Sequence, residues 1–406
     1  MRKPELLAPA GSLEKGKMAL RYGADALYLG GKAFGLRAFA ANFSLEQLQE
    51  ITDFAHSLGK KIYVTVNVVP HNGDLQQLPG YLQDLQRLGV DALLVSDLGV
   101  WRMARRIVPD MPLHVSTQAN TCNIEAVKAW EELGASRVVL ARELSLKEIA
   151  EITAACRTEI EVFVHGAMCI SHSGRCLLSN YFTGRDSNRG ACAQVCRWEF
   201  GLVEKNRPGQ VFPIGEDERG TYILNSKDLC LIDYLPQLME AGVTSLKIEG
   251  RMKSIHYVAT VVAAYRQAID ACYEDPDHYQ VKPLWQQELE KVSHRPYTTG
   301  FAVQKPGSEA QVYTTSSYEQ SADFVGLVLP SDEAAAGQVL VEQRNKVKAG
   351  ENLEVLTPEG QVFTWTLEDM LDSEGQPITV APHAQMKFTA RGDERLLPWS
   401  LVRRLH

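Results

Sequence analysis

The chain has no run of eighteen apolar residues, and this absence excludes a helix that crosses a membrane. Its N-terminal segment lacks the apolar core of a secretory signal peptide, so we expect a cytoplasmic protein. An excess of positive charge is also missing. The net charge of −8 argues against a surface devoted wholly to nucleic acid, although a local basic face remains possible.

Three enzyme signatures are absent as well. No Gly-x-Gly-x-x-Gly follows the first expected strand, and neither a Gly-x-Ser-x-Gly elbow nor a His-Glu-x-x-His helix occurs. His165, Ser171, His172 and Ser173 stand close together in the chain, but without such a frame they do not by themselves indicate a peptidase.

Short apolar segments alternate with amphipathic ones through the first 270 residues. The segment after Ser44 is representative: Ser44 and Gln47 form a capping box, apolar residues recur on one helical face, and Gly59 ends the helix. Ser145 and Glu148 repeat the capping box. The expected strands are Glu5–Ala8, Ala26–Gly30, Lys61–Val68, Ala92–Ser96, Leu113–Gln118, Arg137–Ala141, Glu161–His165 and Thr244–Glu249.

Eight such units predict an α/β protein with a (β/α)8 TIM-like barrel, whose active site lies at the C-terminal ends of the strands. A doubly wound open sheet is the alternative, which the missing glycine fingerprint disfavours. We assign residues 1–275 to this catalytic domain, with a cysteine-rich insertion at 166–243. Residues 276–320 are a linker with a helical segment, and 321–406 show the period-2 strands of a small C-terminal antiparallel β-barrel.

Half of the eight cysteines fall within the twenty-eight positions from Cys169 to Cys196. The spacing is Cys169-x6-Cys176-x15-Cys192-x3-Cys196, and Cys230 follows after thirty-three residues. In a reducing compartment, clustered cysteines indicate metal binding or catalysis rather than disulfides. Irregular loops can supply thiolates to an iron–sulfur cluster. Zinc is second, since only the last pair has knuckle spacing, and buried apolar thiols are the simplest alternative.

Polar residues follow most of the expected strands and would line the barrel mouth, where some could instead form ion pairs between strands. Arg142 and Arg251 are the best candidates for an anionic ligand, because guanidinium groups bind carboxylates in a bidentate manner. The whole set is Asn67, Asp97, Gln118, Asn120, Arg142, Glu143, His165, Lys247, Glu249 and Arg251.

The insertion also carries a local basic character. Between Ala167 and Trp198 stand four arginines and a single acid, Asp186, with Tyr181, Phe182 and Trp198 among them. Arginines beside aromatic rings suit phosphate contacts and base stacking on RNA. The same arginines could simply balance the charge of thiolate and sulfide. They are Arg175, Arg185, Arg189 and Arg197.

Several long segments together resemble peptidase family U32. The family signature matches the stretch from Glu161 through His165, Cys169 and Cys176 to Trp198. Further matching segments are Glu5–Gly11, Asn225–Cys230 and Lys247–Arg251. The resemblance covers essentially the whole chain, including the C-terminal β-domain, and is strongest to the branch that hydroxylates tRNA.

This resemblance implies an activity that the family's name does not state. Members act in oxygen-independent hydroxylation of ubiquinone precursors, ribosomal RNA or the tRNA wobble uridine, and the tRNA branch requires prephenate to form 5-hydroxyuridine. Relatives carry a [4Fe–4S] cluster on four cysteines. By position the ligands here are Cys169, Cys176, Cys192 and Cys230, with Cys196 as an alternate.

We therefore expect a tRNA-modifying enzyme that contacts the tRNA anticodon region, prephenate and an electron donor of unknown identity, and no membrane. Catalytic roles are assigned to His165, Lys247 and Glu249. Substrate binding is assigned to Gln118, Asn120, Arg142, Arg251, Arg185 and Arg189. Two alternatives stay open: a collagenase-like U32 peptidase with zinc or no metal, and an RNA-binding protein whose cluster is structural.

Overall fold

The computed structural model describes most of the chain, and every structural statement below concerns these residues. They are 2–35, 42–168, 178–185, 187, 191–193, 195, 202–203, 211–212, 215–217, 220–222, 227–304, 318–331 and 337–406. Cys169, Cys176, Cys196 and Arg189 lie outside them. No helix in these ranges is long and apolar enough to span a bilayer.

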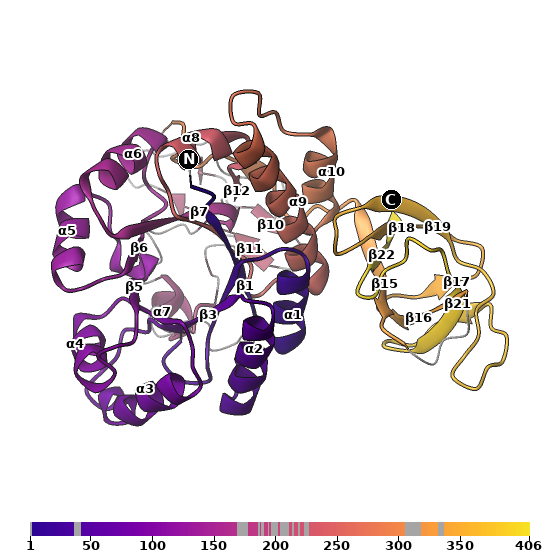
Figure 1. Ribbon diagram of the computed structural model, residues 1–406, viewed down its shortest axis with the longest axis horizontal. Helices are drawn as coiled ribbons and strands as arrows, with labels where there is room; N and C mark the ends of the chain where they lie inside the picture. Colours follow the sequence, from indigo (N-terminus) through magenta and orange to yellow (C-terminus); the bar gives the residue numbers. More distant parts are fainter. Residues whose placement is uncertain are drawn as a thin grey trace.

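Eight parallel strands in the described chain close into a barrel, which confirms the predicted fold class (Figure 1). They pair in sequence order, and β13 closes the ring by pairing with both β1 and β7. Apolar side chains on these strands pack inward and against the helices to form the core. The strands are β1 (Glu5–Pro9), β2 (Ala26–Leu29), β3 (Lys61–Val66), β4 (Ala92–Val95), β5 (Leu113–Val115), β6 (Arg137–Val139), β7 (Glu159–Ala167) and β13 (Ser245–Ile248).

The helices surround the barrel, and their starts follow the sequence signals. Ser44 and Ser145 each cap a helix through the predicted capping box with Gln47 and Glu148. Helix α9 (Ile255–Glu274) is the longest of them and is buried along most of its length, since it packs between the barrel and the C-terminal domain. These helices are α1 (Leu13–Arg21), α2 (Leu45–Ser57), α3 (Leu78–Arg87), α4 (Leu98–Ile107), α5 (Ile124–Glu132), α6 (Leu146–Ala155), α8 (Leu235–Glu240) and α9 (Ile255–Glu274).

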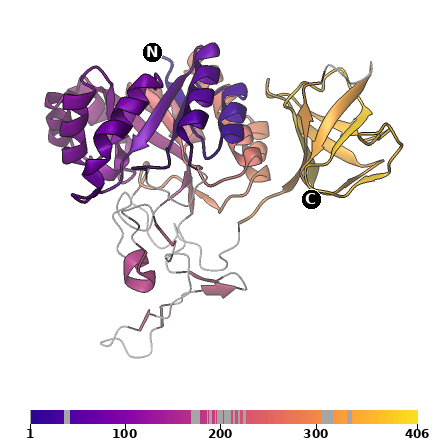
Figure 2. The same ribbon diagram turned by 90° about the horizontal axis from the view of Figure 1, so that it is seen from below.

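Strand β7 is longer than its neighbours and pairs differently along its length. Residues from Glu161 to His165 pair with β13 inside the barrel, whereas His165, Gly166 and Ala167 pair antiparallel with β12 (Asp228–Cys230). The chain leaves β7 for the insertion and returns at β12. Figure 2 shows α7 (Leu178–Thr183) of this insertion on the side of the barrel opposite the N-terminus. The insertion therefore leaves the barrel at the C-terminal ends of its strands, where active sites of this fold lie.

The C-terminal domain contains a six-stranded antiparallel sheet, in the order β19-β18-β22-β15-β16-β21, with its own apolar core. Strand β22 lies in the middle of that sheet, where the sequence predicts no strand. The strands that the sequence predicts in this domain are Asp323–Leu329, Gln338–Gln343, Asn352–Leu356, Val362–Leu367 and Gln385–Thr389. A two-stranded pair, β17 (Val347–Lys348) with β20 (Val380–Ala381), completes the half-barrel. The six strands are β15 (Ala322–Leu329), β16 (Gln338–Gln343), β18 (Asn352–Leu356), β19 (Val362–Thr366), β21 (Lys387–Arg391) and β22 (Leu401–Leu405).

This domain is held against the barrel helices by buried polar contacts. The Tyr22 hydroxyl on α1 reaches two backbone carbonyls of the domain, those of Leu356 and Trp399, each at 2.9 Å. Arg403 on β22 is fully buried and binds Glu288 of α10 (Pro283–Lys291) at 2.6 Å. Unpaired, these groups would be costly to bury, so the contacts fix the orientation of the domain.

Candidate functional site

Two of the predicted mouth residues, Arg142 and Glu249, meet at the C-terminal ends of β6 and β13. Arg142 Nη2 lies 3.5 Å from Glu249 Oε2, and Arg142 Nη1 donates to the Ala167 carbonyl at 2.7 Å. The Tyr28 hydroxyl donates to the Ile248 carbonyl at 3.0 Å and lies 3.4 Å from Glu249 Oε2. Arg142 and Glu249 are each 14% exposed, so this ion pair is accessible yet shielded.

Arg251 lies just past β13 and is 5% exposed, and its guanidinium lies next to Gly30, which directly follows β2. Its Nη2 donates to Asn42 Oδ1 at 2.9 Å. Glycine is required next to it, because a Cβ on Gly30 would collide with the guanidinium and a Cβ on Gly11 would collide with the Arg251 carbonyl. Both glycines fall in segments that follow strands at the mouth. The chain therefore makes room for this arginine.

Gln118 and Asn120 occupy the connection after β5. Gln118 is in a short 3-10 turn, Thr117–Ala119, and Asn120 ends it with a φ of 56°. Asparagine tolerates this left-handed conformation better than most residues. Asn120 Nδ2 donates to the Gln118 carbonyl at 3.3 Å, and both residues are half-buried. They lie at the mouth, but their predicted contact with substrate stays a prediction.

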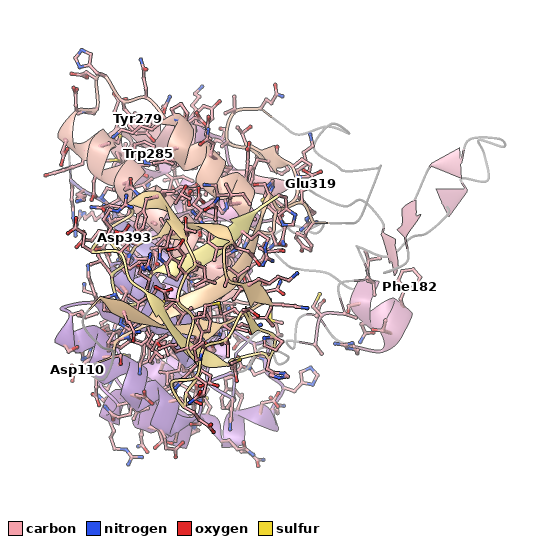
Figure 3. The ribbon with its side chains drawn as sticks, turned by 90° about the vertical axis from the view of Figure 1, so that its right-hand side faces the viewer. Asp110, Phe182, Tyr279, Trp285, Glu319 and Asp393 are labelled. Carbon is pink, nitrogen blue, oxygen red and sulfur yellow. The ribbon has the colours of Figure 1, made fainter. Side chains whose placement is uncertain are left out.

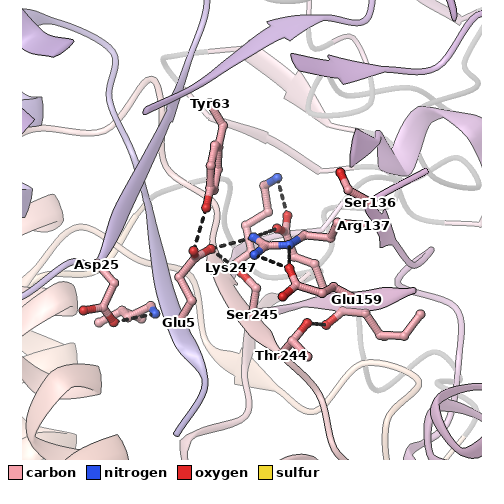
Figure 4. Close-up of polar contacts among 12 residues, drawn as sticks. Glu5, Asp25, Tyr63, Ser136, Arg137, Glu159, Thr244, Ser245 and Lys247 are labelled. Carbon is pink, nitrogen blue, oxygen red and sulfur yellow. Dashed lines mark hydrogen bonds and ion pairs between the residues drawn. The ribbon is translucent and has the colours of Figure 1, made fainter. Parts of the chain in front are cut away.

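Lys247 lies inside the barrel, in a buried charge network (Figure 4). Its Nζ binds Glu161 Oε1 at 2.7 Å, and Arg137 Nη1 binds Glu161 Oε2 at 3.1 Å. Arg137 also binds Glu5 at 2.6 Å and Glu159 at 2.8 Å. One guanidinium thus joins carboxylates from three positions on β1 and β7, and so fixes the strands around it.

The network perturbs its members strongly. Burial alone would raise the pKa of Glu161, but Lys247 and Arg137 overcome this effect and hold that pKa at about 2. Burial and the nearby Arg137 lower the pKa of His114 to about 3, so its imidazole is neutral. Lys247 Nζ is 4.3 Å from the centroid of the Tyr28 ring, and the Phe163 ring contacts both Lys247 and Arg142. The network therefore supports the aromatic side chains beneath the mouth.

His165 faces the helices rather than the mouth pair. It is 1% exposed, and its ring packs against Tyr257 and Tyr265 of α9 and Tyr297 of β14 (Tyr297–Thr298). Burial lowers its pKa to about 3, with His294 and Lys253 adding to the effect. Because it is a neutral imidazole inside an aromatic cluster, its contacts are those of a packing residue, and the catalytic role assigned to it stays a prediction.

Of the five clustered cysteines, the structure describes Cys192 and Cys230, both half-buried and reduced. Cys230 pairs with His165 across β12 and β7 and borders a cavity of about 460 Å³. Burial raises the pKa of its thiol to about 11. Thiolate sulfur is the donor that an iron–sulfur cluster requires, so these residues fit the group chemically. The described ranges hold no set of three metal-binding side chains, and the remaining cysteines lie outside them.

Arg185 and Phe182 belong to the described part of the insertion. Phe182 on α7 is 42% exposed and lies well away from the barrel helices in Figure 3. Arg185 follows the helix and is exposed as well. An aromatic ring and a guanidinium thus stand close in sequence on the mouth side of the molecule. Such a pair suits a nucleic-acid backbone and base.

Sequence reasoning missed several residues that shape the mouth. Tyr28 and Phe163 read as ordinary core positions within apolar strands, and Asn42 lies in a connection with no periodic signal. Tyr28 alone carried a signal, because it lies near the C-terminal end of its strand. Alternation along β7 would place Phe163 and His165 on the same side, and the irregular pairing with β13 that separates them leaves no signal in the sequence.

Comparison with known proteins identifies the family. The model of peptidase family U32 matches residues 11–312, and that of the peptidase family U32 C-terminal domain matches residues 320–403. The chain belongs to peptidase family U32. This confirms the resemblance found in the sequence, and the matches include both the barrel and the C-terminal half-barrel.

Several curated relatives carry names that refer to RNA. The chain is 44% identical to tRNA hydroxylation protein P1 of Bacillus subtilis, covering 99% of this chain and 95% of that protein. It is 39% identical to tRNA hydroxylation protein P of Escherichia coli, covering 94% and 92%. It is also 41% identical to the Escherichia coli 23S rRNA 5-hydroxycytidine C2501 synthase over 67% of this chain and 40% of that protein.

Proposed function

We propose that this U32 protein is a cytoplasmic enzyme that hydroxylates tRNA, converting the wobble uridine to 5-hydroxyuridine without oxygen and with prephenate as co-substrate. The observation that carries the proposal is the 44% identity, along nearly the full length of both chains, to a protein named for tRNA hydroxylation. A relative named for ribosomal 5-hydroxycytidine supports a pyrimidine as the target.

The barrel mouth supplies groups that suit a dicarboxylate. Arg142 and Arg251 each present a guanidinium at the C-terminal end of the barrel, and Glu249 holds Arg142 in place until an anion replaces it. Prephenate has two carboxylates, so each arginine can take one. Tyr28 and Phe163 then lie beside the bound molecule, with the Lys247–Glu161 pair supporting them from inside the barrel.

The insertion is the part we assign to the tRNA. Phe182 can stack on a base splayed out of the anticodon loop, and Arg185, together with Arg189, can contact phosphates. The chain's acidic net charge requires such a local basic segment, since the rest of its surface would repel RNA.

The cofactor we propose is a [4Fe–4S] cluster on Cys169, Cys176, Cys192 and Cys230, with Cys196 as an alternate ligand. When bound, the cluster would supply the redox activity that hydroxylation without oxygen needs and that zinc lacks. Cys192 and Cys230 both belong to the insertion or its return into the barrel, so a cluster on them would tie that segment down.

The first test is the iron, sulfide and zinc content of protein purified without oxygen, measured for the native chain and for Cys176→Ala. The matched control is Cys156→Ala, at the half-buried C-terminal cap of α6. We expect about four irons and four sulfides in the native and control proteins and their loss in Cys176→Ala. tRNA nucleosides from cells carrying each variant should then lose 5-hydroxyuridine only with Cys176→Ala.

Other results would point to the alternatives. Zinc alone, or no metal in any of the proteins, would overturn the redox proposal and favour a peptidase, which a peptide-cleavage assay can check. A native protein with a full cluster and tight tRNA binding, but the same content of 5-hydroxyuridine in cells with native protein and with Cys176→Ala, would favour an RNA-binding protein with a structural cluster.

A further inference from the structure

The Tyr265 hydroxyl group lies 3.7 Å from Cys230 Sγ, behind the wall formed by β7 and β12. Tyr265 is on the middle of α9 and is fully buried. A buried hydroxyl needs hydrogen-bond partners, and this one has several. Their arrangement decides what it can do for the neighbouring sulfur.

The hydroxyl has one proton, which it donates to the Val164 carbonyl at 2.8 Å. Its oxygen accepts from the Leu231 backbone N–H at 3.3 Å, and His165 Nδ1 lies at 3.4 Å. His165 Nε2 is buried and has no partner in the structure. A bare acceptor nitrogen costs less than a bare N–H, so the proton of the neutral imidazole belongs on Nδ1, pointing at the Tyr265 oxygen.

Leu231 has one N–H, which it shares between the Val164 carbonyl at 2.9 Å and the Tyr265 oxygen at 3.3 Å, so the Nδ1–H of His165 is the main donor to this oxygen and strengthens the hydroxyl as a donor. The Val164 carbonyl does not depend on it, because Leu231 N–H also donates to that carbonyl at 2.9 Å. A turn about the Cζ–O bond moves only the hydrogen. It can therefore point the proton at Cys230 Sγ without leaving a buried carbonyl unsatisfied.

We propose that Tyr265 is a positioning residue for the iron–sulfur cluster, whose hydroxyl turns to donate a hydrogen bond to Cys230 Sγ when that sulfur is a ligand. This inference rests on the proposed function, in particular on Cys230 as a cluster ligand. Hydrogen bonds to ligand sulfur help to set a cluster's reduction potential. Because the reduced cluster carries one more negative charge, the donor stabilises that form more and raises the potential.

The test compares Tyr265→Phe with Tyr279→Phe under anaerobic redox titration followed by electron paramagnetic resonance. The control tyrosine is also partly buried nearby, but its hydroxyl donates to the Ile232 carbonyl at 2.9 Å. We expect Tyr265→Phe to keep the full iron and sulfide content. At a fixed potential, its ratio of oxidised to reduced cluster should be about tenfold higher than in the native protein. This equals a lowering of about 59 mV for one electron. Tyr279→Phe should match the native protein.

A full cluster with an unchanged potential in Tyr265→Phe would overturn this inference alone, leaving the proposed cofactor intact. A native protein without iron would overturn both. If Tyr265→Phe loses its cluster, 3-fluorotyrosine at position 265 decides. It keeps the hydroxyl and strengthens it as a donor, so the potential should rise, and an unchanged potential refutes the role.

Discussion

The buried pair of Glu161 and Lys247 gives the sharpest test of the barrel interior. Glu161 is 0% exposed and binds Lys247 and Arg137 through its two oxygens. The catalytic role assigned to Lys247 from the sequence stays a prediction, and its contact in the structure is this buried ion pair. Glu161→Gln keeps the shape of the side chain and removes the charge that both cations face.

The expected loss follows from the pKa of Glu161. The two cations depress it from 4.5 to about 2 against the opposing effect of burial. A depressed carboxyl pKa contributes stability above its unfolded value, which is lost as the pH falls through the folded value. The difference between the unfolded and folded pKa of Glu161 contributes about 3 kcal/mol to the free energy of unfolding at pH 7 and roughly half of that near pH 3. Breaking one partner of a buried pair costs a similar ~3–5 kcal/mol.

Urea denaturation of native protein and Glu161→Gln, repeated between pH 7 and pH 3, measures this difference. The matched control is Glu125→Gln, an exposed carboxylate paired with Lys128 one helical turn away, which should change nothing measurable. A Glu161→Gln variant within about 1 kcal/mol of the native protein, or a loss that does not depend on pH, would refute the assignment of Glu161 as the charged centre of the network.

Two further predictions concern arginines. Arg251→Ala should raise the KM for prephenate about 10- to 100-fold, because a charge-assisted hydrogen bond to the co-substrate is lost, and the iron content should stay unchanged. The control is Arg102→Ala, at an exposed position. Loss of the cluster in Arg251→Ala would instead mark this buried arginine as structural. Arg403→Met should destabilise the protein by ~3–5 kcal/mol, because Glu288 and Glu354 lose one of their two buried cationic partners and share only Lys291. Arg404→Met, partly exposed beside Glu351, should cost far less in the same denaturation assay, and equal losses would contradict this account.

Periodicity predicted the barrel well because its elements carry local signals. Strand β3 and its neighbours were found from apolar runs, and the helix after Ser44 from its cap, since capping and burial act within a few residues. The sequence also placed Arg142 and Glu249 at the mouth, because every parallel strand of a barrel ends on the same face.

Contacts between distant segments could not be predicted in this way. Strand β22 contains Arg403 and Arg404, and two adjacent cations do not look like the centre of a sheet. It becomes one because Glu288, 115 residues earlier, neutralises Arg403. His165 was assigned to the mouth for its place near a strand end, yet the side on which its ring lies depends on α9, ninety residues further along the chain.

The residues on the two sides of β7 have different proposed roles. Phe163 lies on the side of Lys247 and Arg142, whereas His165 and the paired Cys230 lie on the side of Tyr265. Phe163 and His165 are two positions apart and would share a side of a regular strand, but the pairing of β7 with β13 is irregular between them, and this bulge lets one backbone carry both sets. Changes to the mouth arginines should therefore alter co-substrate binding and leave the potential of the cluster unchanged. Changes to Tyr265 should alter the potential of the cluster and leave co-substrate binding unchanged, because Tyr265 and the mouth arginines lie on different sides of the same strand.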